Sequence, residues 1–434
     1  MNTASATGAG IDRDATSATS STSHTWRAVI SASIGNALEW FDLVVYGFFA
    51  VTIARLFFPA HDDTTSLLLT LGTFGVSFFM RPLGAIVIGV YADRRGRREA
   101  LTLTILLMMA GTAIIAFMPT YETIGVLAPM GIVLARMIQG FSAGGEFGSA
   151  TAFLAEHAPQ RRGFFASFQV ASQGLTTLLA AGFGAVLTST LSPEQMQSWG
   201  WRVPFLFGLM IGPVAYYIRR HVSETPEFLE SEPTQTPLRD TLGHQKMRLL
   251  LAVGAVVVAT VSTYLVLYMP TYAIKQLGLP ASVAFAATLA TGIVQMVLSP
   301  IVGAWSDRVG RAKPMMIAAA LLLVSIWPMF WLLTTHPSFG MMLALQTLLG
   351  VLMTIYFAPL PALASEIFPV KTRTTGLSLS YNLSVTCFGG FAPFILTWLI
   401  TATGSKLAPS FYMMAAAAAG LIALSQVYRH TGVR

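Results

Sequence analysis

The stretch GVYADRRGRR at residues 89–98 decides the fold, because a close copy, GAWSDRVGR, returns at residues 303–311. Each copy places an acid and several arginines directly after an apolar run. An apolar run of about 20 residues spans the hydrocarbon core of a bilayer, which is roughly 30 Å thick. The two copies therefore predict membrane-spanning helices that occur in duplicated sets.

A second repeated pattern has nearly the same offset. Glu156, Pro159 and Arg161 of the first half correspond to Glu366, Pro369 and Lys371 of the second half. Two matches at nearly one offset are hard to obtain by chance. Duplicated halves around a site at the middle of the membrane are typical of transporters.

The composition supports a lipid-embedded chain. Of the 434 residues, 54% are hydrophobic and only 10% are charged, whereas soluble domains carry about 25% charged residues. We predict an all-α membrane protein with twelve transmembrane helices in two pseudo-symmetric six-helix bundles. The predicted spans are residues 26–56, 66–92, 98–118, 122–157, 163–190, 201–221, 246–275, 281–306, 312–334, 338–366, 371–402 and 407–429. The prolines expected to kink them are Pro82, Pro204, Pro270, Pro300 and Pro393.

Lysine and arginine are concentrated in alternate joints, and such joints usually face the cytoplasm. We therefore expect a protein of a bacterial inner membrane with both termini on the cytoplasmic side. Residues 1–25 are rich in Ser, Thr, Ala and Gly, and we expect a disordered cytoplasmic tail. The charged segment 222–245 is predicted to link an N-terminal bundle, 26–221, to a C-terminal bundle, 246–429.

Ionisable residues within predicted spans are costly in lipid and by default suggest function. The first span contains Glu39 and Asp42, the second contains Arg81, and the fourth contains Arg136. At about 100° per residue, Glu39, Asp42 and Tyr46 share one helix face. We expect that face to border a central cavity or a neighbouring helix.

These motifs resemble the major facilitator superfamily and, more narrowly, its metabolite:proton symporter family, over residues 26–429. Within that family the chain is most similar to citrate and tricarballylate symporters, although residues 389–393 and 408–412 also fit the proline/betaine branch. Besides the two loop copies, the residues that carry the resemblance are Gly35-Asn36-x-Leu38-Glu39-Trp40-Phe41-Asp42, Phe79-Met80-Arg81-Pro82, Arg136-x-x-Gln139-Gly140, Gly144-Gly145-Glu146 and Trp199-Gly200-Trp201-Arg202.

The resemblance implies proton-coupled uptake of a small organic acid by alternating access. It makes Asp42 the proton-coupling acid, Arg136 its partner and Glu39 the second candidate acid. Protonation would loosen an Asp42–Arg136 pair and so change the conformational preference. The alternative is a permanent pair that only orders two helices.

Arg81 lies near mid-depth, where its planar guanidinium suits a substrate carboxylate. Its alternative role is a pair with Glu39 or Asp42. Arginines favour a di- or tricarboxylate, whereas Glu39 together with Glu146 would suit a zwitterion such as proline or betaine. The candidate substrate ligands, for which packing is the alternative, are Arg81, Arg136, Asn36, Tyr46, Gln139, Gln169, Gln173, Tyr268, Gln295, Tyr381 and Asn382.

Charged residues at the predicted cytoplasmic helix ends form a separate group. The resemblance implies that they make salt bridges that latch the inside-closed state, and the alternative is that they only set topology. The group consists of Asp93, Arg97, Glu156, Arg162, Asp307, Arg311, Glu366 and Arg373.

The sequence gives no support for an enzyme, because it lacks nucleophile–base, metal-ligand and phosphate-loop patterns. We expect no metal site and no cofactor apart from the coupling proton. The expected partners are an organic anion, the proton and membrane lipid, without nucleic acid. A passive channel or a transporter-like receptor is the alternative from another functional class.

Overall fold

The computed structural model describes residues 39–95, 97–144, 161–220, 245–369 and 372–432, together with residues 29, 33–34, 36–37 and 243. The regular structure of these ranges is entirely helical. Predictions for the tail 1–25, for Glu146 and Glu156, and for nearly all of the linker 222–245 lie outside the described residues.

The described helices follow the predicted spans. The N-terminal half contains a segment Glu39–Phe48, α2 (Ala50–Phe57), α3 (Asp63–Arg95), α4 (Arg97–Phe117), α5 (Tyr121–Ile124), α6 (Leu127–Ala143), α8 (Arg162–Thr190), α9 (Pro193–Gln195), the π-helix η2 (Met196–Gly200) and α10 (Arg202–Arg220). The C-terminal half contains α13 (Lys246–Gln276), α14 (Ala281–Val309), α15 (Ala312–Thr335), α16 (Phe339–Phe357), α17 (Leu360–Ile367), α18 (Arg373–Ser384), the π-helix η4 (Val385–Gly389), α19 (Ala392–Thr403) and α20 (Ala408–Thr431).

Eight helices of the described ranges are long and apolar enough to cross a membrane, and a bent pair makes a ninth. The helices α4, α6 and α10 lie where the remaining three spans are predicted. The multi-pass membrane character is therefore confirmed.

The first predicted span is not one continuous helix. Its segment Glu39–Phe48 and α2 meet at an angle of 70°. The break follows Gly47, which lies directly against the side chain of Leu267, and it involves no proline. On the other side, the Ser66 hydroxyl holds the end of α2, 2.9 Å from the Ala54 carbonyl oxygen and 2.6 Å from that of Phe58.

The five prolines occupy two kinds of position. The helices α3, α13 and α14 continue through Pro82, Pro270 and Pro300. Pro204 and Pro393 instead lie in the first turns of α10 and α19, where a missing backbone N–H leaves no intrahelical bond unmade. These two prolines therefore lie where an α-helix begins.

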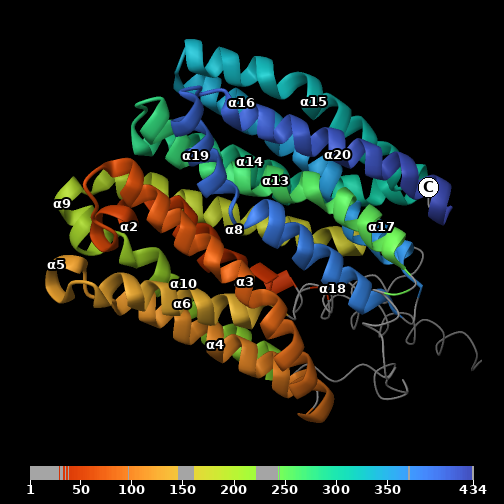
Figure 1. The fold of residues 1–434 in the computed structure, drawn as a ribbon, viewed down its shortest axis with the longest axis horizontal. Helices are drawn as coiled ribbons and strands as arrows, with labels where there is room; N and C mark the ends of the chain where they lie inside the picture. Colours follow the sequence, from red (N-terminus) through yellow and green to blue (C-terminus); the bar gives the residue numbers. More distant parts are fainter. Residues whose placement is uncertain are drawn as a thin grey trace, which may run out of the picture.

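Glycines allow two helix pairs to approach closely. Within the N-terminal half, Gly140 of α6 contacts the Ser77 backbone of α3. Between the halves, α8 and α14 pack along their length, with Gly163 against Gly303 at one end and Gly184 against Phe285 at the other. Figure 1 shows α8 crossing the middle of the molecule between α3, α4 and α6 on one side and α15, α16 and α20 on the other.

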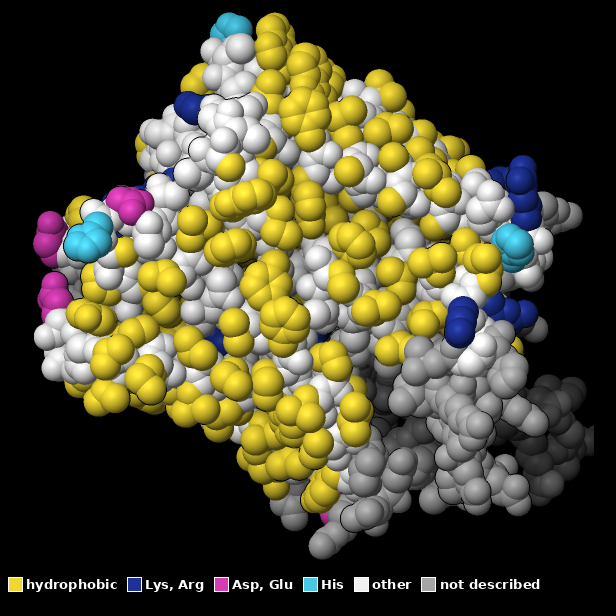
Figure 2. Space-filling view, viewed as in Figure 1, with side chains coloured by type: hydrophobic (Ala, Val, Ile, Leu, Met, Phe, Trp, Pro, Cys, Tyr) yellow, Lys and Arg dark blue, Asp and Glu magenta, His cyan; other side chains and the backbone are white. Residues whose placement is uncertain are grey.

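The outer surface is strongly apolar. Figure 2 shows hydrophobic side chains covering the central band and charged side chains collected near its two edges. Large apolar residues such as Met210, Val324 and Ile422 are 75%, 74% and 67% exposed. A continuous apolar surface of this kind would favour aggregation in water, but it suits a lipid environment.

Candidate functional site

A buried ion pair joins the first span to α3. Arg81 Nη2 lies 3.5 Å from Glu39 Oε1, and both side chains are at most 9% exposed. The Arg81 guanidinium also lies over the Phe78 ring, with 4.6 Å between its Cζ atom and the ring centroid. Arg81 was predicted to bind a substrate carboxylate or to pair with Glu39 or Asp42. In this structure it pairs with Glu39.

Asp42 lies one turn further along the same helix and belongs to a different network. Its Oδ2 atom accepts a hydrogen bond from the Thr112 hydroxyl of α4 and lies 3.5 Å from Gln139 Nε2 of α6. Gln139 Oε1 in turn accepts a hydrogen bond of 2.8 Å from Arg136 Nη1. The expected direct Asp42–Arg136 pair is therefore absent among the described contacts, because the Gln139 amide lies between the two charges.

Arg136 is held by aromatic rings as well as by hydrogen bonds. Its Cζ atom lies 4.6 Å from the Tyr46 ring centroid and 5.1 Å from that of Phe74. Its Nη2 atom lies 3.4 Å from Ser77 Oγ. Cation–π contacts of this kind gain strength where water is excluded. The Tyr46 hydroxyl donates to the Thr70 carbonyl, so Tyr46 presents its ring to Arg136.

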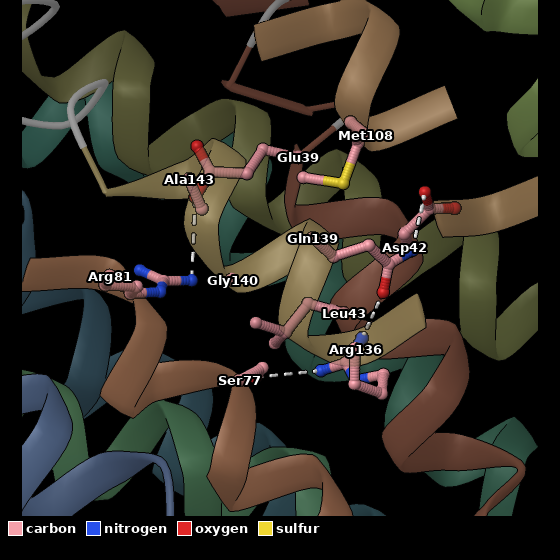
Figure 3. Close-up of a pocket in the computed structure, with 10 residues that line it drawn as sticks. All are labelled: Glu39, Asp42, Leu43, Ser77, Arg81, Met108, Arg136, Gln139, Gly140 and Ala143. Atoms are coloured by element: carbon pink, nitrogen blue, oxygen red, sulfur yellow. Dashed lines mark hydrogen bonds and ion pairs between the residues drawn. The ribbon is translucent and has the colours of Figure 1, made fainter. Parts of the chain in front are cut away.

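These charged groups share one small pocket, shown in Figure 3. It is lined by Glu39, Asp42, Leu43, Ser77, Arg81, Met108, Arg136, Gln139, Gly140 and Ala143, all from the N-terminal half. The cavity volume of about 10 Å³ is close to what one water molecule needs. In the described conformation the pocket therefore has room for about one water molecule and not for a larger ligand.

Aromatic residues of the C-terminal half lie next to the pocket. The Tyr264 ring contacts Phe78 at 5.5 Å and Trp40 at 6.3 Å between centroids. Among the described residues, its hydroxyl has no hydrogen-bond partner. Tyr381 of α18 is 4% exposed and lies within electrostatic reach of Arg81 and Glu39. Tyr264 and Tyr381 therefore approach the Glu39–Arg81 pair from the opposite half.

The remaining predicted ligands lie on the contact between the halves or away from it. Asn36 Nδ2 donates to Ser172 Oγ at 2.8 Å and to the Gln169 carbonyl at 3.1 Å. Asn382 Nδ2 donates to the Gly144 carbonyl at 3.2 Å, which joins α18 to the end of α6.

Gln173 and Gln295 are buried on α8 and α14, on either side of the close approach at Gly174. Neither amide atom of the Gln173 side chain has a partner in the described part of the chain. Tyr268 differs, because its hydroxyl accepts a hydrogen bond from Thr397 and its ring packs against Tyr272. It is engaged within the C-terminal half and has no described contact with the charged pocket.

Two residues of the site, Thr112 and Ser77, were not among the predicted site residues. Thr112 lies in an apolar helix, where nothing local distinguishes a buried hydroxyl that bonds a carboxylate from one that bonds its own helix. Ser77 is similar, since only the packing of α3 against α6 brings it to Arg136.

Comparison with known proteins identifies the family to which this chain belongs. The Sugar (and other) transporter model matches residues 28–239, and the Major Facilitator Superfamily model matches residues 280–433. The citrate-proton symporter of Klebsiella pneumoniae is 41% identical over 418 residues, which cover 94% of this chain and 92% of the relative. The chain belongs to the major facilitator superfamily. The matched families and relatives are transporters, not enzymes.

Other relatives are more distant. The ectoine/proline transporter ProP of Corynebacterium glutamicum is 35% identical over 422 residues, covering 92% of this chain and 82% of the relative. Among solved structures, the proton:xylose symporter XylE bound to 6-bromo-6-deoxy-D-glucose has a TM-score of 0.75 at 17% identity, covering 94% of this chain and 96% of that chain. The latter similarity shows the major facilitator fold.

In this major facilitator chain, the second loop copy closes one end of the contact between the halves. The Asp307 carboxylate accepts hydrogen bonds from the Gly163 and Phe164 backbone N–H groups, at 2.9 and 3.0 Å, and thereby caps α8. Arg311 Nη1 lies 2.6 Å from Asp307 Oδ1, and Arg311 Nε lies 3.4 Å from Glu366 Oε1. We call Asp307, Arg311, Glu366 and the α8 N-terminus the Asp307 latch.

The other predicted latch residues have varied settings. Arg373 Nε donates to the Ser365 carbonyl at 2.8 Å. The Nε atom of Arg162 is buried without a partner in the described ranges. The side chains of Asp93 and Arg97 lie outside the described part of the structure, as does Glu156.

A second contact between the halves occurs at the opposite end. Lys275 Nζ lies 2.6 Å from Asp63 Oδ2, with side chains 20% and 71% exposed. With this pair and the Asp307 latch, the two halves touch at both ends of the bundle.

The neighbouring Asp62 caps α3, and hydrogen bonds from the Thr65 hydroxyl, the Thr65 N–H and the Thr64 N–H lower its pKa.

Proposed function

We propose that this protein is a secondary active transporter that carries citrate, or a related tri- or dicarboxylate, into the cell together with a proton by alternating access. The observation that carries the proposal is a buried pocket with two arginines and two carboxylates. The similarity to proteins named citrate-proton symporters, at 41% and 39% identity, supports it.

The charge of the pocket explains why an anion and a proton would travel together. With Glu39 and Asp42 ionised, their charges balance those of Arg81 and Arg136. One proton on Asp42 leaves an excess positive charge, which favours binding of an anion in a site of low dielectric. Binding of the anion in turn favours retention of the proton, since such coupling is reciprocal.

Arg81 is the proposed principal ligand for a substrate carboxylate. Its 3.5 Å contact with Glu39 is long for a charge-assisted hydrogen bond. A substrate carboxylate that displaces Glu39 gains a bidentate contact with the planar guanidinium. Tyr264 and Tyr381 of the opposite half are placed to complete the site, and Gln173 and Gln295 offer neutral dipoles along α8 and α14.

Arg136 and Gln139 are proposed to transmit the protonation state of Asp42. While Asp42 is charged, Gln139 can hold its amide between the carboxylate and Arg136. Neutralisation weakens the carboxylate's hold on Gln139, because hydrogen bonds to charged groups are stronger than neutral ones. The arginine then becomes more available to an anion.

The Asp307 latch and the Lys275–Asp63 pair are proposed as inner and outer closures. This assignment follows the expected orientation, with both termini in the cytoplasm and the chain in a bacterial inner membrane. The proposed cycle uses a proton, an organic anion and membrane lipid, and it requires no cofactor, metal or nucleic acid.

The test is uptake into proteoliposomes. Purified protein should accumulate labelled citrate against its gradient when the outside is acidified, and a protonophore should abolish the accumulation. Saturable, gradient-driven accumulation separates a symporter from a channel, which only equilibrates, and from a receptor, which only binds. Equal uptake with and without the proton gradient would overturn the proposal.

A proline- or betaine-type osmolyte is the second candidate substrate. The adjacent charges of Glu39 and Arg81, together with Trp40 and Tyr264, supply both signs and aromatic faces to a zwitterion. Glycine betaine in the same assay distinguishes the candidates. Accumulation of betaine without accumulation of any di- or tricarboxylate would favour the zwitterion.

A further inference from the structure

The two carboxylate oxygens of Asp42 have different surroundings. Oδ2 accepts the Thr112 hydrogen bond and lies near Gln139. Oδ1 has no hydrogen-bond partner in the described part of the structure. It faces the backbone of α10 at Gly208, where an added Cβ would lie only 2.8 Å from it. Thr112 and Gln139 therefore supply the described hydrogen bonds to the ionised acid.

The Thr112 hydroxyl has a choice of acceptors. Besides Asp42 Oδ2, it lies 3.0 Å from the carbonyl oxygen of Met108, one turn earlier in α4. It also accepts from Gln139 Nε2 at 3.1 Å. A hydroxyl carries a single hydrogen, so at any moment it donates either to the carboxylate or to its own helix.

We propose that Thr112 is a positioning residue for proton binding at Asp42. This inference rests on the proposed proton coupling. While Asp42 is charged, Thr112 donates to Oδ2. When a proton enters on Oδ2, the new O–H donates to Thr112 Oγ1, and the Thr112 hydrogen turns to the Met108 carbonyl. Asp42 and Thr112 therefore stay hydrogen-bonded to each other in both states, and only the direction of the bond between them reverses.

The packing shows which charged and titratable groups lie around Asp42 and Thr112. Arg136 faces it from α6 and Arg81 from α3, while Glu39 and Tyr46 lie on the same helix as Asp42. These groups remain in a Thr112 variant, so a change in the pH dependence reports the lost hydroxyl. The hydroxyl favours the charged acid, because a hydrogen bond to a carboxylate is stronger than one to a neutral carboxyl.

The experiment compares Thr112→Val with Thr112→Ser in proteoliposomes, using initial rates of labelled citrate uptake over a range of external pH. Thr112→Val should displace the pH profile toward alkaline values by about one to two units, the equivalent of one charge-assisted hydrogen bond. Thr112→Ser keeps the hydroxyl and should restore the profile. Citrate counterflow, which needs no net proton movement, should persist in both variants.

Thr354→Val is the matched control. Thr354 is equally buried, but among the described residues its hydroxyl bonds only the Gly350 carbonyl of its own helix, at 2.7 Å. This control should leave the pH profile in place. Should Thr112→Val fail to reach the membrane, Thr112→Ala removes the same hydroxyl and carries the same expectation.

A Thr112→Val profile that coincides with the wild type would overturn the inference, as would an equal displacement in Thr112→Ser. Failure of the underlying function looks different. In that case the wild type itself shows no gradient-driven uptake, whichever residue occupies position 112.

Discussion

The Asp307 latch gives the sharpest prediction of conformational control. Asp307→Asn keeps the shape of the side chain but removes its charge, and we expect it to favour separation of α8 from α14 at that end. The carboxylate now accepts two backbone N–H groups at 2.9 and 3.0 Å and pairs with Arg311 at 2.6 Å. With side chains 12% and 10% exposed, respectively, Asp307 and Arg311 are little screened by water.

The magnitude follows from these contacts. Neutralising the acceptor costs about 1 kcal/mol for each of two hydrogen bonds, and the lost interaction with the helix dipole adds about 0.3–1 kcal/mol. A total of about 2–3 kcal/mol shifts the opening equilibrium by about 30- to 150-fold. The exposed Lys275–Asp63 pair contributes at most about 1 kcal/mol. Asp63→Asn should therefore shift the equilibrium by roughly fivefold or less, and it should favour opening at the opposite end of the bundle.

A cysteine at Ser167 makes the shift measurable. Ser167 is fully buried on α8 beside Gly303 of α14, so it becomes reactive when those helices separate. The background carries Cys387→Ser, because Cys387 is the native cysteine and is exposed. The alkylation rate should rise in Asp307→Asn and should not rise in Asp63→Asn. Unchanged labelling in Asp307→Asn, or equal labelling in the two variants, would refute the latch.

Three further predictions concern the charged residues. Asp42→Asn should abolish proton-driven citrate uptake and leave counterflow exchange, and surviving uphill uptake would remove Asp42 from the coupling role. Arg81→Lys, which loses the planar fork, should raise KM for citrate roughly tenfold, an interaction of about 1.4 kcal/mol, whereas an unchanged KM would exclude Arg81 as a ligand. Asp62 has a lowered pKa, so the stability that it adds is present above its unfolded pKa and is lost as pH falls through the folded value. The Tm difference between wild type and Asp62→Asn should therefore be constant near neutrality and should shrink as the pH falls below about 4, and a difference that stays constant in acid would contradict the capping role.

The fold was largely predictable from the sequence because lipid imposes a simple rule on apolar length. Local breaks were not predictable in the same way. The 70° bend after Phe48 lies beside Leu267 of α13, which contacts Gly47, and nothing in the sequence of the first span indicates that contact. Similarly, the sequence does not tell whether a proline lies inside a helix, as Pro270 does, or in its first turn, as Pro204 does.

The site was predictable as a set of charges but not as a set of pairs. Helical periodicity correctly placed Glu39 and Asp42 on one face bordering the pocket. It carries no information about the relative heights of neighbouring helices, and those heights decide that Arg81 meets Glu39 while Gln139 separates Asp42 from Arg136. Thr112 needed the three-dimensional contact between α4 and the first span.

The arrangement also suggests how chemistry in one half becomes movement of both halves. The pocket has room for about one water molecule, far less than a tricarboxylate requires. Its charged groups belong to the N-terminal half, whereas Tyr264, which packs on Trp40 and Phe78 beside them, belongs to the C-terminal half. Admission of substrate therefore requires those aromatic contacts to separate. In the proposed cycle, substrate binding at Arg81 would drive the displacement of the opposite half, whereas proton binding at Asp42 would depend on groups of the N-terminal half. Under the proposed mechanism, this division would let a small electrostatic change at Asp42 determine which anion-bound conformation is favoured.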